Sequence, residues 1–319
     1  MQGLSCPECG AAGRRRFAVR DRLFHTTSRR FEIAACTGCG LQFLWPQPSA
    51  QELPGFYPAG YWVGPSDRRP AAGRLGGWLE RYRRAVLIDH VRFVRALVER
   101  QRATGAWRGL LDVGCGDGSF LEALGARPAV GLDWSAEAVH AVAARGFASL
   151  RGQLLAAPLT PGSVSVVTMF HYLEHVTGAG EHLSAARRLL GPGGRLVVQV
   201  PNAAAWQCRL LRGRWGGYDP PRHLVNYDTV TLRRTLERHG FQVRRTTHRS
   251  LRDNPTTLVN SLAPGLYPPA RLGRPGRHAT RDWLASAAYL GLVLVAMPPT
   301  SLEAALGRGA AVMMEAEPV

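Results

Sequence analysis

The stretch that most constrains the fold of this chain is Leu110–Gly118, which reads LLDVGCGDG. A short apolar run, typical of a buried strand, leads into Gly114, Gly116 and Gly118, and a helix is predicted to begin near Ser119. Because glycine has no side chain, the backbone can approach a ligand closely, and the start of the helix directs free N–H groups toward it. The segment therefore predicts a nucleotide-like ligand bound by an α/β fold.

The spacing of the glycines indicates which ligand is bound. A dinucleotide-binding loop has the pattern GxGxxG, whereas this loop has GxGxG followed by Ser119. Asp112, two residues before the first glycine, suits a ligand that carries an ammonium group. Asp133 ends the next apolar run, about 20 residues further on, where an acidic residue receives the two ribose hydroxyls in such folds.

Together these features resemble class I S-adenosylmethionine-dependent methyltransferases. Three later segments continue the resemblance in the same order, and the last also recurs in the ubiquinone-biosynthesis-like branch: Val164–Val176, Leu190–Asn202 and Asp219–Leu224. The resemblance implies a Rossmann-like, seven-stranded, mostly parallel sheet with helices on both faces. Its seventh, antiparallel strand is expected at Ala310–Ala316.

The resemblance also implies which residues bind S-adenosylmethionine. They are expected at the ends of successive strands: Asp112, Gly114, Cys115, Gly116, Gly118, Asp133, Trp134, Gln153, Leu154 and Phe170. Gln153 stands where the family has an acidic residue that contacts the adenine amine. Glutamine retains a carbonyl acceptor, so the contact is expected to survive.

Four of the six cysteines form two CxxC units, each followed by glycine. Cys6, Cys9, Cys36 and Cys39 can present four thiolates tetrahedrally to a structural zinc ion. The alternatives are two disulfides or a redox pair, but a cytosolic chain keeps its thiols reduced. Residues 1–48 are therefore interpreted as a zinc-ribbon-like module.

The rest of the chain is expected to form two further units. Residues 49–105 are interpreted as an ordered connector and a covering helix, from about Leu75 to Arg102, that lies against the sheet at the cofactor site. Residues 106–319 alternate strands and helices and form the methyltransferase domain.

The net charge is +17, and all 40 basic residues are arginine. Without lysine, a Schiff-base site and a phosphate-binding P-loop are excluded. Arginine without lysine can reflect codon bias, so the charge is not taken as evidence for nucleic-acid binding. The N-terminal sequence lacks the basic and apolar regions of a secretory signal, which favours a cytoplasmic protein.

Candidate catalytic residues follow the fourth and fifth strands. Glu174 and His175 match positions that hold a divalent metal in the ubiquinone-type relatives, with His171 in place of a further acid; alternatively, they anchor the next helix. His223 is interpreted either as a general base or as a residue that anchors its loop. Asp219 and Arg222 are expected to orient His223 or to bind an anionic substrate.

An uncharged run of 15 residues, 283–297, follows a basic segment that begins at Arg271. It is shorter than the 18 or more residues expected of a spanning helix. It is interpreted either as a buried or substrate-covering helix or as a peripheral membrane contact.

The leading hypothesis is a methyltransferase that acts on a hydroxyl or carbon of a sugar, lipid-linked or specialised metabolite. The first alternative is an RNA-base methyltransferase that uses the ribbon to hold RNA. However, the segment after the fourth strand lacks the Asn/Asp-Pro-Pro-aromatic motif of amino-group methylators, so nucleic acid is disfavoured as a partner. The second alternative is a protein that binds the cofactor without catalysis. The oligomeric state is not predicted.

Overall fold

The computed structural model describes residues 3–58, 61, 85–272 and 279–319. The first part of the helix predicted over residues 75–102 lies outside these residues, as do Arg274 and Arg277 of the basic segment.

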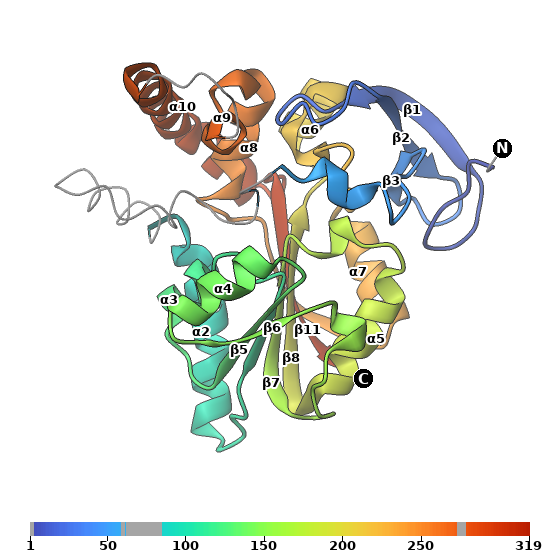
Figure 1. The fold of residues 1–319 in the computed structure, drawn as a ribbon. Helices are drawn as coiled ribbons and strands as arrows, with labels where there is room; N and C mark the ends of the chain where they lie inside the picture. Colours follow the sequence, from blue (N-terminus) through green and yellow to red (C-terminus); the bar gives the residue numbers. More distant parts are fainter. Residues whose placement is uncertain (1–2, 59–60, 62–84, 273–278) are drawn as a thin grey trace.

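Seven strands form the large sheet, in the order β10-β11-β8-β7-β4-β5-β6 (Figure 1). Their bounds are β4 (Leu110–Val113), β5 (Ala129–Asp133), β6 (Ala148–Arg151), β7 (Val164–Phe170), β8 (Leu190–Pro201), β10 (Phe241–Thr247) and β11 (Ala311–Pro318). Strands β4 to β8 pair in parallel, whereas β11 pairs antiparallel with both β8 and β10. The Rossmann-like sheet predicted from the sequence, including its antiparallel strand, is confirmed.

Helices cover both faces of the large sheet (Figure 1). One face carries α2 (Ile88–Ala103), α3 (Ser119–Leu124) and α4 (Ala136–Ala144); the other carries α5 (Ala179–Leu189) and α7 (Thr229–Arg238). The apolar residues of α2, among them Val94 and Leu97, are buried against the sheet, in agreement with the helical spacing in the sequence. The side chain of Asp228 caps α7 by accepting a hydrogen bond from the Thr231 N–H.

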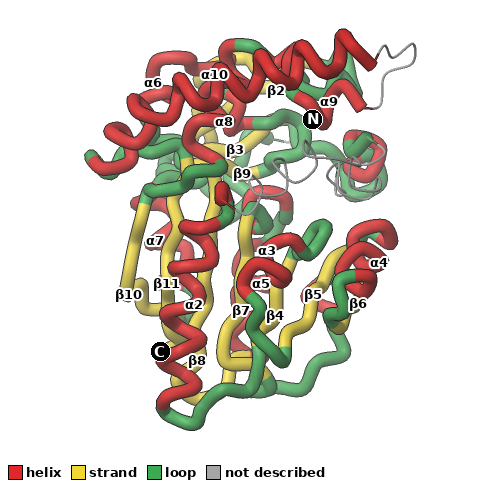
Figure 2. The backbone as a smooth tube through the Cα atoms, turned by 90° about the vertical axis from the view of Figure 1, so that its left-hand side faces the viewer, coloured by secondary structure: helices red, strands yellow, loops and turns green. Residues whose placement is uncertain are grey.

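A second layer of helices lies beyond the carboxyl ends of the parallel strands (Figure 2). It consists of α6 (Trp206–Leu211), α8 (Asp253–Leu262), α9 (Pro268–Leu272) and α10 (Ala279–Ala305). Of the interpretations of residues 283–297, that of a short, buried helix is wrong, because the helix is longer and mostly exposed. Pro298 and Pro299 lie inside α10 and do not end it. Of the described residues, Asp282–Ala305 form one helix long and apolar enough to cross a membrane, and only 22% of the apolar window is buried.

The small sheet joins the N-terminal module to the methyltransferase domain. Its strands β1 (Gly13–Arg20), β2 (Arg30–Cys36) and β3 (Gln42–Trp45) continue into β9 (Val225–Asn226), which follows β8 in the chain. Phe43 pairs with Val225, and Phe43 packs in the same apolar core as residues of β7 and β8. The small sheet is therefore not confined to residues 1–48.

A buried cluster of charged residues also holds the N-terminal module against the methyltransferase domain. The Arg222 guanidinium is fully buried and donates to Asp219 at 2.6 and 2.8 Å and to Asp21 at 2.9 and 3.2 Å. It also lies over the ring of Phe24, 4.6 Å from the centroid. Burial alone would raise the pKa of Asp21, but the contact with Arg222 lowers it to about 2. Arg222 therefore has a structural role, and the expectation that it binds an anionic substrate is wrong.

Replacing Arg222 by methionine should destabilise the chain by about 3–5 kcal/mol, because two carboxylates remain buried without their cation. Urea unfolding followed by circular dichroism measures this change. The matched control is Arg29→Met, which removes a half-exposed ion pair with Glu52 and should cost at most about 1 kcal/mol. Equal effects of the two substitutions would contradict the assigned role of Arg222.

Candidate active site

The glycine loop connects β4 to α3 at the carboxyl edge of the sheet. Gly114, Gly116 and Gly118 have φ angles of 74°, 51° and 75°, a left-handed conformation that glycine adopts without strain. A Cβ atom at Gly114 would lie 3.2 Å from the Tyr172 ring. Both the backbone conformation of the loop and its packing against Tyr172 therefore favour glycine at position 114.

Asp133 closes the loop from the end of β5. Its carboxylate accepts hydrogen bonds from the Gly116 N–H at 3.1 Å and the Ser135 N–H at 2.9 Å. Burial raises the pKa of Asp133 above its usual value. Each carboxylate oxygen retains acceptor capacity, as contact with a pair of ribose hydroxyls requires.

Asp112 lies in β4, two residues before the loop. Its carboxyl group is buried and accepts a hydrogen bond of 2.6 Å from the Thr168 hydroxyl. Burial raises the pKa of Asp112 to about 7, and Asp133 contributes in the same direction. Among the described residues this buried carboxyl group has no ion-pair partner, so it is suited to receive a cation.

The other predicted cofactor residues differ in exposure. Cys115 and Leu154 are buried, and Gln153 is exposed just before Leu154. Trp134 is 42% exposed. Phe170 packs edge-on between the rings of His90 and Phe120, with centroids 4.9 and 4.8 Å away. All these residues follow the carboxyl ends of β4 to β7, so they border one edge of the sheet.

The three candidate catalytic residues lie together. The ligand atoms of Glu174, His175 and His223 all lie within 4.8 Å of one another. Nδ1 of His223 donates to the Gly217 carbonyl at 2.8 Å, which leaves its Nε2 as an acceptor. The rings of His175 and His223 meet edge-on with centroids 4.6 Å apart. A neutral imidazole can accept a proton, and the three groups together can hold a divalent cation.

The charges of this cluster follow from its surroundings. Burial raises the pKa of Glu174, but the hydrogen bond from His171 outweighs it and holds the pKa below its usual value. Burial lowers the pKa of His175 to about 3. At neutral pH, Glu174 is thus ionised and His175 is neutral. Oε2 of Glu174 is buried and has no hydrogen-bond partner among the described residues.

The connector contributes a tyrosine that was not predicted as a site residue. The Tyr57 hydroxyl lies 3.0 Å from Nδ1 of His175, and the Tyr57 ring packs edge-on against Trp134 at 5.8 Å. It thus links the candidate catalytic cluster to the adenine-binding side predicted at Trp134. The only signal in the sequence was the aromatic-rich stretch Phe56-Tyr57-Pro58, which required a packing partner.

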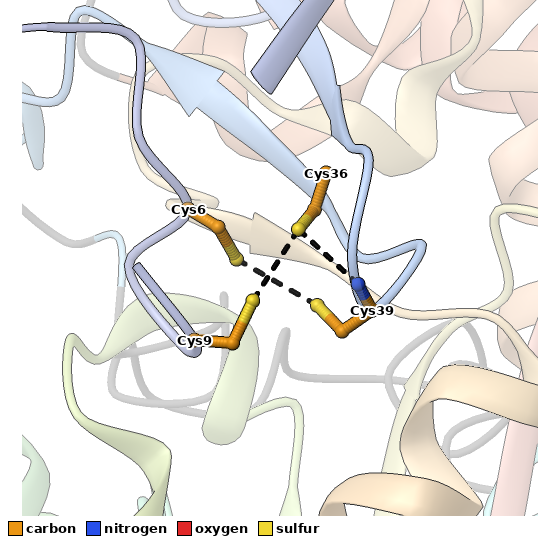
Figure 3. Close-up of side chains that lie close together, drawn as sticks. All are labelled: Cys6, Cys9, Cys36 and Cys39. Atoms are coloured by element: carbon orange, nitrogen blue, oxygen red, sulfur yellow. Dashed lines mark hydrogen bonds between the residues drawn. The ribbon is translucent and has the colours of Figure 1, made fainter. Parts of the chain in front are cut away.

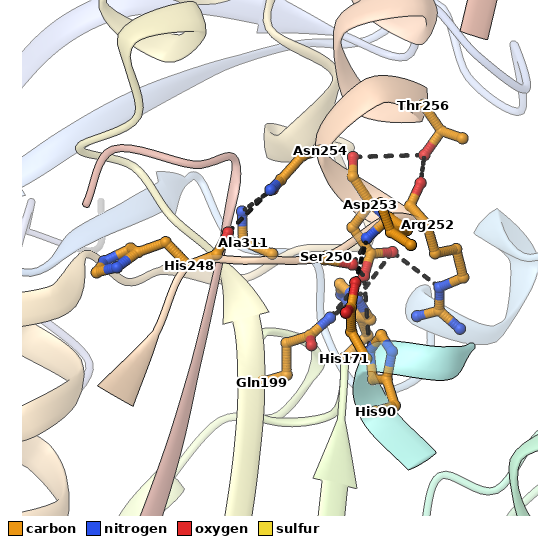
Figure 4. Close-up of polar contacts among 12 residues, drawn as sticks. His90, His171, Gln199, His248, Ser250, Arg252, Asp253, Asn254, Thr256 and Ala311 are labelled. Atoms are coloured by element: carbon orange, nitrogen blue, oxygen red, sulfur yellow. Dashed lines mark hydrogen bonds and ion pairs between the residues drawn. The ribbon is translucent and has the colours of Figure 1, made fainter. Parts of the chain in front are cut away.

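A second polar network lies beside the cluster (Figure 4). His171, at the end of β7, contacts Glu174 at 3.0 Å and Asp253 at 3.3 Å. Burial lowers the pKa of His171, but the two carboxylates outweigh it and raise the pKa to about 9. Gln199 and Arg252 also donate to the Asp253 carboxylate, at 2.6 and 2.9 Å. No motif in the sequence pointed to Asp253.

The four ribbon cysteines converge (Figure 3). Sγ atoms lie 3.7 Å apart for Cys6 and Cys39 and 3.4 Å apart for Cys9 and Cys36, and all four cysteines are free thiols. Tetrahedral coordination with zinc–sulfur bonds of about 2.3 Å requires sulfur separations of about 3.8 Å. The donor set and its spacing fit a zinc ribbon.

Comparison with known families identifies the domain. The profile of a family described as a methyltransferase domain matches residues 79–246, more than half of the chain. The chain belongs to this methyltransferase family. By family and fold it is a class I S-adenosylmethionine-dependent methyltransferase, as the sequence motifs predict.

Curated relatives of this chain are also named as methyltransferases. A probable S-adenosylmethionine-dependent methyltransferase of Mycolicibacterium smegmatis is 32% identical over 145 residues, which cover 43% of this chain and 53% of the relative. A ubiquinone biosynthesis O-methyltransferase of Sodalis glossinidius is 32% identical over 133 residues, which cover 37% and 53%. The chain thus spans about half the length of these curated relatives.

Among solved structures, one described as a possible histamine N-methyltransferase from Thermotoga maritima is similar to this chain. It has 19% sequence identity and a TM-score of 0.42, and the match covers 75% of this chain and 94% of that one.

Cofactor affinity should depend on the ionisation of Asp112. Its pKa of about 7 means that the carboxylate needed to attract an ammonium group is lost as the pH falls. The dissociation constant for S-adenosylmethionine, measured by calorimetry, should rise roughly tenfold between about pH 7.5 and 6. Asp112→Asn should bind weakly with little pH dependence over this range. An unchanged pH profile in the variant would show that another group titrates.

Proposed function

We propose that this methyltransferase transfers a methyl group to a hydroxyl or carbon of a small molecule, such as a sugar, a lipid-linked compound or a specialised metabolite. The proposal is supported by the placement of two sets of residues at the same edge of the large sheet, one suited to bind the cofactor and the other to act on the acceptor. The glycine loop with Asp112 and Asp133 lies on one side, and Glu174, His175 and His223 lie beside it.

The residues around the glycine loop would hold the cofactor. S-adenosylmethionine supplies an electrophilic methyl group when it is bound. Asp112 would bind its ammonium group, Asp133 its ribose hydroxyls, and Trp134 and Gln153 its adenine. The glycines at 114, 116 and 118 adopt the left-handed backbone by which the loop would approach the ligand.

A hydroxyl acceptor must lose its proton during transfer, and we assign His223 as the base. Its Nδ1 is held by the Gly217 carbonyl, so Nε2 is free to accept the proton. A second candidate mechanism uses Glu174 and His175, with His223, as ligands of a divalent metal that polarises the acceptor hydroxyl. The buried, unpartnered Oε2 of Glu174 supports this alternative.

Two further proposals concern the N-terminal cysteines and helix α10. We assign a structural zinc ion to Cys6, Cys9, Cys36 and Cys39, because four sulfur ligands leave no open position for catalysis. We also assign peripheral membrane contact to residues 283–297, whose apolar side chains are largely exposed. A lipid-linked acceptor would suit that contact.

The proposed function is tested by labelling a cell extract with S-adenosylmethionine that carries a tritiated methyl group. Label should appear in small-molecule or lipid fractions with wild-type protein but not with Gly116→Val. Valine is strained at the φ of 51° at this position and fills the loop. Label confined to RNA would support base methylation instead. Cofactor binding with no label in any fraction would indicate a binding protein without catalysis.

The base is tested by substituting His223 with alanine. With a hydroxyl acceptor, turnover should fall by roughly 10²–10⁴-fold while the affinity for S-adenosylmethionine stays nearly unchanged. The control, His140→Ala, changes an exposed histidine on α4 and should leave turnover intact. If a chelator inhibits the wild-type protein and an added divalent ion restores turnover, the metal mechanism is correct. Full activity of His223→Ala without chelator sensitivity would exclude both.

The zinc proposal predicts about one zinc ion per chain by elemental analysis. Cys9→Ser should lose the ion and lower the thermal midpoint by about 10 °C, equivalent to about 3 kcal/mol, because the small sheet shares a core with the methyltransferase domain. Cys208→Ser, outside the cluster, should retain the zinc ion. A zinc-free wild-type chain with the same midpoint would refute the proposal.

A further inference from the structure

Helix α10 is attached to the molecule along one face only. Its buried positions recur every three or four residues: Tyr289, Val293, Ala296, Thr300 and Glu303. The Tyr289 hydroxyl donates to Asn260 of α8 at 2.9 Å, and Glu303 accepts hydrogen bonds from the N–H and the side chain of Gln207 in α6. These contacts hold the helix lengthwise on α8 and α6 (Figure 2).

The outward face of α10 carries no charge. From Trp283 to Leu306, every exposed side chain is uncharged, and Val295 is 74% exposed. The two acidic residues of Asp282–Ala305 are withdrawn from this face, since Asp282 pairs with Arg271 and Glu303 is buried. The exposed large apolar side chains are Trp283, Leu284, Leu290, Leu292, Leu294, Val295, Leu302 and Leu306.

The apolar face of α10 is broad, which favours a lipid surface over a protein partner. A helix that docks in a protein groove presents an apolar stripe with polar flanks. Here most positions beside the large side chains are also apolar, among them Ala287, Gly291 and Pro298, and the exposed polar ones, Ser286 and Ser301, carry no charge. The helical segment Asp282–Ala305 has 24 residues and is about 36 Å long. Because its inner face is fixed to α8 and α6, the helix lies along the molecule and presents a side, which suits the interface of a bilayer.

Helix α6 extends the apolar surface and adds positive charge. Trp206 and Leu210 are exposed on α6, and Leu210 is 81% exposed. Arg209 on the same helix, Arg212 just after it and Arg308 just after α10 are exposed. Arginine side chains at the border of an apolar surface are attracted to anionic headgroups. This charge complementarity favours a lipid surface over a second copy of the same basic chain.

We propose that the outward faces of α10 and α6 form a lipid-facing surface that docks the protein on an anionic bilayer without crossing it. Helix α8 packs between this surface and the site, because Asp253 at its first position contacts His171. An amphiphilic acceptor with its apolar part in the lipid therefore reaches the site from this layer. This statement about the acceptor rests on the proposed methyl transfer, whereas docking itself does not.

The experiment measures flotation of the full chain with lipid vesicles. Vesicles contain phosphatidylcholine alone or with phosphatidylglycerol. Wild-type protein should float with the anionic vesicles, more weakly with neutral ones, and less as salt is added. Val295→Glu should reduce partitioning about tenfold. The matched control is Val319→Glu, which places the same charge at a residue 67% exposed in another part of the molecule.

The outcomes separate this inference from the proposed function. Cofactor binding by each variant, measured by calorimetry, shows that the fold is intact. Cofactor binding without flotation would overturn the docking inference and leave the methyltransferase proposal standing. Self-association without lipid that Val295→Glu abolishes, with no flotation, would show that the face is an interface between copies. Equal flotation of Val295→Glu and Val319→Glu would overturn the assignment of the surface.

Discussion

The position of the Arg222 guanidinium determines how the N-terminal residues meet the rest of the molecule. A fully buried cation must be paired, and its two partners are distant in the sequence, Asp21 before β2 and Asp219 after β8. Pairing of β3 with β9 holds the same contact through the backbone. As a result, Tyr57 lies against His175, and the candidate active site includes a residue outside the range matched by the methyltransferase family.

The carboxylates at the sheet edge differ in how their charge is balanced. On the cofactor side, burial raises the pKa of Asp112 and Asp133, and neither has an ion-pair partner among the described residues. On the other side, Arg252 and His171 lower the pKa of Asp253, and His171 lowers the pKa of Glu174, so both pKa values lie below the usual range despite burial. The first pair lacks an ion-pair partner among the described residues, whereas the second pair already has protein cations beside it, although Oε2 of Glu174 has no hydrogen-bond partner among those residues. This division agrees with a cationic cofactor beside the glycine loop.

The sequence predicts what depends on local spacing and fails where distant segments meet. The glycine loop, the order of strands and the cysteine cluster were predictable, since each is encoded by a short pattern or by motif order. Arg222 was misjudged because its partner Asp21 lies 201 residues away. The extent of helix α10 was underestimated because the uncharged run 283–297 was judged by itself, whereas the helix continues through Pro298 and Pro299 to Ala305. How much of helix α10 is exposed depends on tertiary packing, which the amino-acid composition does not reveal.

The antiparallel strand of the large sheet has a consequence for the order of folding. Strand β11 lies between β8 and β10, but it is the last strand in the chain and follows α10. During synthesis, β8 and β10 leave the ribosome with their shared neighbour missing, and the apolar α10 emerges before the sheet can close. Completion of the sheet therefore waits for residues 311–318, and until then the nascent chain exposes both an open strand edge and an apolar helix. Exposed strand edges and apolar surface of this kind favour aggregation, so the last strand protects the nascent chain as well as completing the sheet.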